Sequence, residues 1–261
     1  MKRKPIIGIA LGSGAARGMS HIGVLKALEE NDIHVDIIAG CSAGALVGSL
    51  YCCNIDAKTI GAIANNIDRK LWVDVTIPKR GFIKGQKVED MIRLLTKNKN
   101  IEDLDKKLII VSTDLKKGEK YVFTEGPIYR AVRASISIPG VFIPVRMNDM
   151  MLVDGAVIDR VPISEVKKAG ADIVIGVDVG FSSQQGRTNH IVDIILQSID
   201  VMAKQIMSEQ MVVADVLLEP DVSHIGPSRF DLVEDCVKVG YDTTMEKIDI
   251  IKEKINEYKN T

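Results

Sequence analysis

The feature that most constrains the fold of this chain is the pentapeptide Gly40-Cys41-Ser42-Ala43-Gly44, which lies between a strand-like run over residues 35–39 and a helix-like run over residues 45–53. A Gly-x-Ser-x-Gly sequence between a strand and a helix is typical of a nucleophile elbow. The turn is too tight for a Cβ on either side of the serine, so glycine stands at both flanks. It holds the serine hydroxyl beside a helix N-terminus, which favours negative charge. A glycine-rich turn without chemistry is the alternative at this point.

The chain before this turn has the pattern of a βαβ unit. Residues 6–11 are apolar and rich in isoleucine, as in a buried parallel strand, and they lead through a glycine-rich turn into a helix over residues 19–31. A right-handed crossover then predicts an α/β fold with a mainly parallel sheet. Further strands are expected over residues 107–113, 120–123, 142–147, 150–153, 172–179 and 216–219, and further helices over residues 56–67, 88–96, 128–135 and 191–214.

Size and composition predict one domain with a large core. The 261 residues are 46% hydrophobic and 26% charged, without a repeat or a low-complexity linker. We expect a single domain over residues 1–261, with the motifs in residues 6–180 and a helical part over residues 190–261. The net charge of -1 and the lack of a long basic run argue against nucleic acid as a partner.

The cysteines and the apolar runs bear on the compartment. Cys41, Cys52, Cys53 and Cys236 have neither metal-site spacing nor a disulfide pattern, so we expect small buried side chains in a reducing cytoplasm. Glycines interrupt the apolar stretch that follows the basic start, which differs from a signal peptide, and no apolar run reaches the length of a membrane span. We therefore expect a cytoplasmic protein with no metal site and no cofactor.

The first glycine turn, Gly12-Ser13-Gly14, is a candidate oxyanion hole. It follows a strand that neighbours the strand before Ser42, so both turns are expected at the same sheet edge, where open α/β sheets bind ligands. Its backbone N–H groups would lie at the start of a helix. Arg17 either belongs to this anion-binding turn or forms a salt bridge at the surface. A dinucleotide site is disfavoured, because Arg17 replaces the third glycine of that motif and no acidic residue ends the second strand.

The base that would activate Ser42 has to be found elsewhere in the chain. No histidine stands in a recognisable motif: the four are His21, His34, His190 and His224. We expect the His21 ring to point away from the strand ends, since it lies one turn into the first helix. Asp154 ends an apolar strand and precedes Gly155-Ala156, which leaves backbone room at the carboxylate. It is the candidate base, and an aspartate in a tight turn at a strand end is the alternative.

Together these motifs resemble those of the patatin-like phospholipase family. Residues 12–18 (GSGAARG), the turn around Ser42, residues 133–140 (RASISIPG) and Asp154-Gly155-Ala156 occur in the order seen in that family. The resemblance covers residues 6–180 and is strongest to the compact bacterial members. It implies a three-layer α/β/α sandwich with a mainly parallel central sheet.

The resemblance also implies the chemistry of the site. Ser42 would be the nucleophile and Asp154 the general base of a Ser–Asp dyad, whose carboxylate burial makes more basic. The oxyanion hole would be Gly12, Ser13 and Gly14, and the supporting positions would be Arg17, Gly40, Gly44 and Gly155. Ser13 stands where the plant members have a glycine, and its backbone N–H survives that change.

The family implies a lipid acyl ester as substrate, which would be a phospholipid, a lysophospholipid or a neutral lipid, without a cofactor. Two other interpretations stay open: transfer of the acyl group to an acceptor other than water, and a non-catalytic regulatory protein that keeps the fold. Transient contact with a membrane surface and a homo-oligomer are both compatible with the sequence.

Two segments are candidates for contact with lipid. Residues 70–86 lack periodicity and contain Trp72 and Phe82, which suits a lid or a substrate rim; a packed surface loop is the alternative. The helix expected over residues 191–214 could touch lipid or a second subunit, or it could be a core-facing amphipathic helix. Its apolar side chains are Ile194, Ile195, Met202, Ile206, Met207 and Met211.

Overall fold

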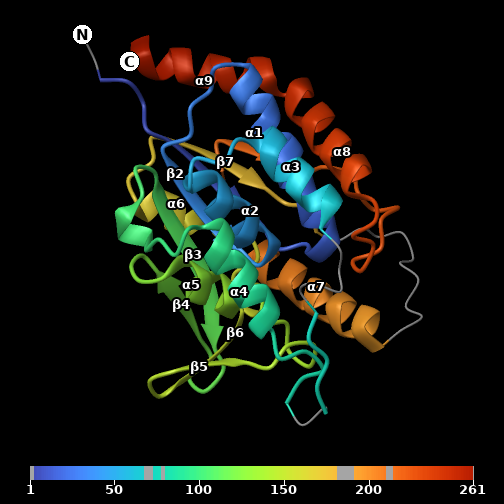
Figure 1. Cartoon of the computed structure of the whole chain (residues 1–261). Coiled ribbons are helices and arrows are strands. Elements are labelled where there is room, and N and C mark those ends of the chain that lie inside the picture. Colours follow the sequence, from blue (N-terminus) through green and yellow to red (C-terminus); the bar gives the residue numbers. More distant parts are fainter. Residues whose placement is uncertain (1–2, 68–72, 78–79, 181–190, 210–213, 261) are drawn as a thin grey trace.

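A computed structural model describes residues 3–67, 73–77, 80–180, 191–209 and 214–260 (Figure 1). One eight-stranded sheet contains β1 (Ile7–Leu11), β2 (Ile37–Cys41), β3 (Lys107–Asp114), β4 (Glu119–Phe123), β5 (Val145–Met147), β6 (Met150–Asp154), β7 (Ile173–Val177) and β8 (Val216–Leu218). The α-helices are α1 (Ser20–Glu30), α2 (Ala43–Cys52), α3 (Ala57–Asn66), α4 (Gln86–Leu95), α5 (Ile128–Ser135), α6 (Ile163–Lys168), α7 (Ile191–Glu209), α8 (Val233–Glu246) and α9 (Ile248–Asn260). Two short 3-10 helices matter below, η1 (Ala15–Met19) and η4 (Gly155–Val157).

The central strands are parallel, as the βαβ pattern predicts. β1 pairs in parallel with β2 and with β7, β2 pairs in parallel with β3, and β7 with β8. The second strand begins two residues later than expected, at Ile37 instead of residue 35. The reason is that the Asp36 carboxylate accepts the backbone N–H of Ile7 over 2.8 Å, so ladder pairing starts after it. The strand also ends two residues later than expected, so Gly40 and Cys41 belong to β2.

The two strand ends that carry Ser42 and Asp154 meet on β3. Ile110 of β3 pairs with β2 and with β4, so β2 and β4 lie on opposite edges of β3. Two residues further along, Ser112 pairs with β4 and with Asp154 of β6, so β6 lies on the same edge as β2. Since β2 is parallel to β3 and β6 is antiparallel to it, their carboxyl ends face each other on that edge. This register brings Ser42 next to Asp154.

Side chains of the central strands alternate between two cores, one on each face of the sheet. Ile9, Leu11 and Ile38 lie in the larger core, to which α1, α2, α5 and α8 contribute. Ala10 and Ala39 lie in the smaller core beneath α6. Helices therefore cover both faces (Figure 1), which confirms the expected three-layer α/β/α sandwich with a mainly parallel sheet.

Three further boundaries differ from the sequence-based expectation. α2 begins at Ala43, directly after the serine, and not at residue 45. The strand expected over residues 142–147 is limited to β5, because Phe142 forms a bridge with Ile83 instead. The helix expected over residues 191–214 ends at Glu209; residues 210–213 lie outside the described part, and Ala214 is not helical. Within the described ranges, every helix is too short or too polar to cross a membrane.

The C-terminal helices pack closely on the part of the chain that carries the motifs. α8 lies so near α1 that a Cβ on Gly23 would be 1.9 Å from the carbonyl O of Val237. A Cβ on Gly240 would be 2.0 Å from the carbonyl O of Ser20. Such close helix contacts support the view that residues 1–261 fold as one domain, which stays a prediction.

Candidate active site

Ser42 occupies a strained turn between β2 and α2. Its φ of 52° and ψ of -117° are unfavourable for a residue with a side chain, at a cost of about 1–3 kcal/mol. The backbone N–H of Ser42 donates a hydrogen bond of 2.8 Å to the Oγ of Ser135. The Ser135 hydroxyl in turn donates to the carbonyl O of Val111 on β3 over 2.6 Å. The turn is thus anchored to the neighbouring strand through Ser135, which belongs to the RASISIPG segment.

The glycines that flank the serine are required by close contacts. A Cβ on Gly40 would lie 2.5 Å from the Cα of Ala45, and one on Gly44 would lie 2.1 Å from the carbonyl O of Leu11. Both neighbours are backbone atoms, which cannot move aside without distorting β1 or α2. Glycine is therefore required at both positions, as the tight turn predicts.

Asp154 brings a buried carboxylate to the serine. The backbone N–H of Ala156 donates to its Oδ1 over 2.9 Å, and Ser42 lines the same small cavity. Only 2% of the residue is exposed, and this burial raises its pKa to about 6, although the Ser42 hydroxyl and the Ala156 N–H both favour the ionised form. Gly155 leaves the space for this approach, since a Cβ there would lie 2.5 Å from the carbonyl O of Val111. The carboxylate is ionised at neutral pH and able to accept a proton.

The first glycine turn differs from the sequence-based expectation. The N–H of Gly12 donates to the carbonyl O of Val177 and that of Ser13 to the carbonyl O of Arg160, each over 3.0 Å. These two groups are engaged, so the prediction that Gly12 and Ser13 offer donors to an oxyanion is wrong. Within the described part of the chain, the N–H groups of Gly14 and Ala15 have no acceptor. Both residues line a small cavity with Ser42 and Asp154, and Ala15 has a φ of 49°.

Arg160 was not anticipated from the sequence, although it fixes this turn. It is 2% exposed, and its Nη2 donates to the carbonyl O of Ser13 over 3.0 Å while its own carbonyl O accepts the Ser13 N–H. Its Nε donates to Oδ1 of Asp178 over 3.2 Å. The Ser13 peptide is therefore held on both sides by one residue. A single arginine six positions after Asp154 carries no pattern that sequence analysis could use.

Arg17 and His21 are both buried near this turn. Arg17 is 3% exposed and its Nε donates to the carbonyl O of Ile225 over 2.7 Å, so it is not a surface salt-bridge residue.

The expectation that the His21 ring points away from the strand ends is wrong. The 3-10 helix η1 delays the start of α1 and places His21 in the first turn of α1. Its Nε2 lies 2.7 Å from the carbonyl O of Gly12 and donates to it. Burial lowers the pKa of His21 to about 4, so the ring is neutral at pH 7.

The other histidines lie apart from these groups. His34 is exposed before the start of β2, and His224 is exposed in the segment before α8. His190 lies outside the described residues. Among the residues that the structure describes, no group of three His, Cys, Asp or Glu side chains is arranged to hold a metal ion.

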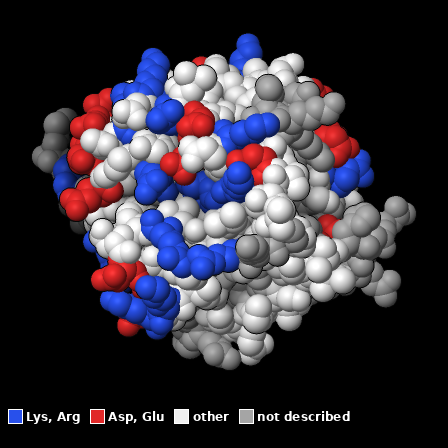
Figure 2. All heavy atoms as spheres, turned by 60° about the horizontal axis from the view of Figure 1, so that its bottom comes forward, with Lys and Arg blue, Asp and Glu red and all other residues white. Residues whose placement is uncertain are grey.

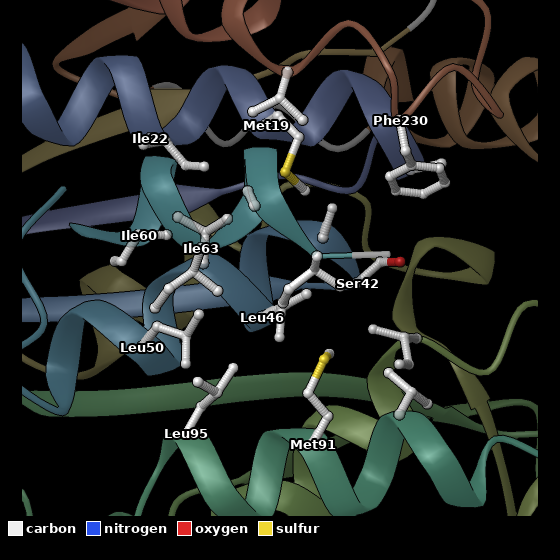
Figure 3. Close-up of a pocket in the computed structure, with 18 of the residues that line it drawn as sticks. Met19, Ile22, Ser42, Leu46, Leu50, Ile60, Ile63, Met91, Leu95 and Phe230 are labelled. Atoms are coloured by element: carbon white, nitrogen blue, oxygen red, sulfur yellow. The ribbon is translucent and has the colours of Figure 1, made fainter. Parts of the chain in front are cut away.

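An apolar pocket of about 310 Å³ extends from Ser42 between α2, α3 and α4. Figure 3 shows Ser42 at one end, Leu46 and Met91 further in, and Leu50, Ile60 and Leu95 at the far end. Apart from Ser42, the polar side chains in its wall are those of Asn65 and Asp231. Its volume is at the lower end of the usual range for small-molecule sites, about 300–1,000 Å³.

The two candidate segments for lipid contact, residues 70–86 and the helix from residue 191, are only partly described by the structure. Trp72 lies outside the described residues, whereas Phe82 is 36% exposed and is not part of the pocket wall. On α7, Leu196 and Ile199 line the cavity at Ser42 and Asp154, while Ile194 and Met202 are more than half exposed. Ile195 and Ile206 are half-buried; the Met207 side chain and all of Met211 are outside the described part. α7 therefore contributes apolar side chains both to the site and to the surface.

The sequence model of the family described as patatin-like phospholipase matches residues 9–167. The chain belongs to the patatin-like phospholipase family. This span contains the glycine turn, Ser42 and Asp154. It ends in α6, so β7 and the later elements lie outside the matched part.

Relatives that are more than 30% identical include long fungal proteins. The chain is 36% identical over 180 residues to "Lysophospholipase NTE1" of Yarrowia lipolytica, which covers 67% of this chain and 13% of that protein. It is 34% identical over 190 residues to the protein of the same name from Scheffersomyces stipitis, which covers 70% of this chain and 12% of that protein. The chain therefore spans only about an eighth of the length of these relatives.

Solved structures with the same patatin-like fold include VipD from Legionella pneumophila, with a TM-score of 0.67 at 15% identity over 95% of this chain and 67% of that one. A second is the type III effector protein ExoU, with a TM-score of 0.54 at 16% identity over 97% of this chain and 54% of that one. At these identities the likeness concerns the fold alone.

We expect Asp154→Asn to stabilise the fold at neutral pH. An unfolded aspartate has a pKa of about 3.9, whereas the native Asp154 has a pKa of about 6. Between these values the native chain keeps a proton that the unfolded chain has released. The free energy of unfolding of the wild type therefore falls as the pH rises from 4 to 6 and stays lower above it, by about 3 kcal/mol at most.

Urea unfolding at pH 4 and pH 8 checks this expectation, with the exposed Asp149→Asn as control. The asparagine side chain introduced by Asp154→Asn would keep an oxygen for the Ala156 N–H and would have no charge to bury. The variant should gain stability over the wild type at pH 8 and lose that advantage at pH 4. Equal stability at pH 8 would contradict a raised carboxyl pKa.

Proposed function

We propose that this chain is a lipid acyl-ester hydrolase in which Ser42 is the nucleophile and Asp154 is the general base. The observation that carries the proposal is that a serine in a strained turn and a buried carboxylate line one small cavity, beside an apolar pocket. Membership of the patatin-like phospholipase family supports it independently.

In the proposed first half-reaction, the Ser42 Oγ attacks the carbonyl carbon of the ester while Asp154 accepts the hydroxyl proton. The negative charge moves to the former carbonyl oxygen, for which the N–H groups of Gly14 and Ala15 are the available donors. When the C–O bond to the alcohol breaks, Asp154 returns the proton to the leaving oxygen. The acyl group is then covalently attached to Ser42.

The second half-reaction releases the acyl group as a free acid. Asp154 removes a proton from a water molecule, whose oxygen attacks the acyl carbon. The new tetrahedral intermediate uses the same donors, and its collapse expels the Ser42 alkoxide, which recovers the proton from Asp154. A carboxylate with a pKa of about 6 suits both directions, since it is ionised at pH 7 yet basic enough to bind the proton transiently.

We further propose a substrate with one acyl chain, such as a lysophospholipid, drawn from a membrane surface by a cytoplasmic protein. The pocket at Ser42 has an apolar wall and a volume near the lower limit for small-molecule sites, which suits a single chain. The fungal relatives carry the name lysophospholipase, although the chain spans only 12–13% of their length.

We expect Ser42→Ala and Asp154→Asn each to lower kcat/KM on a soluble short-chain ester by about 10³-fold or more, and the double variant to be little worse than either. The two groups act as one unit, so the second loss removes nothing further. Steady-state kinetics checks this, with Asp149→Asn as the exposed carboxylate control. Near-normal turnover in Asp154→Asn would refute the proposed base.

Labelling and product analysis complete this test. A fluorophosphonate should label the wild type and not Ser42→Ala, and absence of label in the wild type would favour a non-catalytic protein. Products formed with and without an added alcohol distinguish hydrolysis from transfer. A new ester as the main product would replace hydrolysis by acyl transfer.

We expect Leu95→Trp to shorten the acyl chain that the enzyme accepts. Leu95 lies at the far end of the pocket from Ser42 (Figure 3), so a larger side chain there fills space without touching the reacting groups. The ratio of kcat/KM for a dodecanoyl ester to that for a butanoyl ester should fall at least tenfold, and Leu95→Ala should raise it. Equal losses on both esters would show that the chain binds elsewhere.

A further inference from the structure

Large apolar side chains are exposed mainly on one face of the described structure. Of eleven such side chains, seven lie on residues 73–77 and 80–85 or on α7: Val75, Ile77, Phe82, Ile191, Ile194, Val201 and Met202. Ile77 is 80% exposed and Val75 is 77% exposed. The teal residues 73–77 and 80–85 and the orange helix α7 all lie in the lower part of Figure 1. Apolar side chains that gather in this way mark a binding surface.

The exposed loop is fixed to the body by a buried arginine. The Nη2 of Arg133 donates to the carbonyl oxygens of Lys84 and Ile143, over 2.6 Å and 2.8 Å. Its Nε donates to the carbonyl O of Gly85 over 3.1 Å. The backbone of the loop is therefore held in place while Val75 and Ile77 point into solvent. Such an arrangement presents apolar side chains instead of burying them.

The loop and α7 flank one segment that lines the acyl pocket. A Cβ on Gly81 would lie 2.5 Å from the carbonyl carbon of Phe142, so the loop touches this segment from one side. A Cβ on Gly140 would lie 3.1 Å from the Cδ1 of Ile195, so α7 touches it as well. Phe142 and Ile138 belong to the wall of the pocket. The exposed apolar surface is thus continuous with the place where the acyl chain is proposed to bind.

α7 has apolar side chains on two sides. Leu196 and Ile199 line the cavity that contains Ser42 and Asp154, on the inner side. Its exposed apolar residues recur with helical spacing, which places them together on the outer side: Ile191, Ile194, Val201 and Met202. α7 therefore lies between the cavity at Ser42 and Asp154 and the exposed apolar side chains on its own outer side.

Cations border the apolar side chains. Arg80, Lys84 and Arg146 are exposed, and no carboxylate within the described ranges forms an ion pair with any of them. The carboxylate of Asp74, on the same loop, is occupied by the backbone N–H groups of Gly85 and Gln86. Figure 2 brings this side of the molecule forward and shows Lys and Arg side chains, with Asp and Glu among them, beside a broad uncharged area. The surface therefore combines apolar side chains with positive charge that pairs with no carboxylate of the described residues.

We propose that these residues form a docking surface for a bilayer that contains anionic lipids. The docking surface consists of Val75, Ile77, Phe82, Arg80, Lys84 and Arg146, together with the outer face of α7. Apolar side chains would enter the interface while the cations bind phosphate groups, a combination that a purely apolar protein partner does not require. The proposal rests on the proposed function in one respect, that the substrate is drawn from a lipid surface.

Vesicle flotation of the full chain tests the docking surface. The Ser42→Ala background prevents lipid hydrolysis during the measurement, and the vesicles are phosphatidylcholine with 30% phosphatidylglycerol or phosphatidylcholine alone. Removing three cations, in Arg80→Ser/Lys84→Ser/Arg146→Ser, should weaken binding to the anionic vesicles about 100-fold, since each cation contributes about fivefold. Val75→Ser/Ile77→Ser should weaken it at least tenfold.

Matched controls lie on α3 and α4, outside the residues of the docking surface. Leu94→Ser removes an apolar side chain that is 78% exposed, and Lys58→Ser removes an exposed cation of α3; each should change binding less than threefold. Equal binding of all variants, or equal binding to vesicles without anionic lipid, would overturn the proposal. A stable dimer that Val75→Ser/Ile77→Ser disperses would also overturn it, because it would assign the surface to a second copy of the chain.

Turnover of a soluble butanoyl ester separates this proposal from the proposed function. In an otherwise wild-type chain, the docking variants should keep that turnover and lose activity only on lysophospholipid in vesicles. A wild type that binds anionic vesicles and hydrolyses no ester would refute the proposed function and leave the docking surface intact. A wild type that hydrolyses the ester and fails to bind the vesicles would refute the docking surface alone.

Discussion

The arrangement of this site depends on two strands that run toward each other along one edge of β3. β2 and β6 occupy the same edge with opposite directions, so their carboxyl ends meet. Ser42 follows the first strand and Asp154 ends the second, and both residues line the same small cavity. Backbone ladders on β3 therefore fix the distance between hydroxyl and carboxylate, with no mobile loop between them. Pre-organisation of this kind is what the proposed Ser42–Asp154 unit requires.

The same arrangement is costly for the fold. Ser42 has a positive φ, Ala15 has another, and Asp154 is an ionised carboxylate with little access to water. Compensating contacts surround the site. Arg160 holds the Ser13 peptide on both sides, and the neutral His21 ring donates to the carbonyl O of Gly12. Gly14 and Ala15 line the cavity beside Ser42, and their N–H groups have no acceptor among the described residues, which suits stabilisation of negative charge there.

Features that neighbouring residues determine were predictable from the sequence, and features that depend on residues far along the chain were not. The turn around Ser42 was predictable, because the steric demand falls on Gly40 and Gly44 and is visible as residue types. The mainly parallel sheet was predictable from apolar runs, and the three-layer arrangement from the resemblance to the family. The engagement of the Gly12 and Ser13 donors was not, since their acceptors are Val177 and the carbonyl of Arg160, more than a hundred residues away. The orientation of His21 was missed because a 3-10 turn delays the helix that carries it.

The most direct test of the central claim is the pH dependence of kcat/KM on a soluble short-chain ester, compared between the wild type and His21→Gln. Asp154 must be ionised to accept the proton, and burial raises its pKa to about 6, so the rate should fall as the pH drops below about 6. His21→Gln should leave this limb in place, because the ring has a pKa of about 4 and contacts the carbonyl of Gly12. An acidic limb that disappears or moves in His21→Gln would show that a histidine is the base and would contradict the Ser–Asp account.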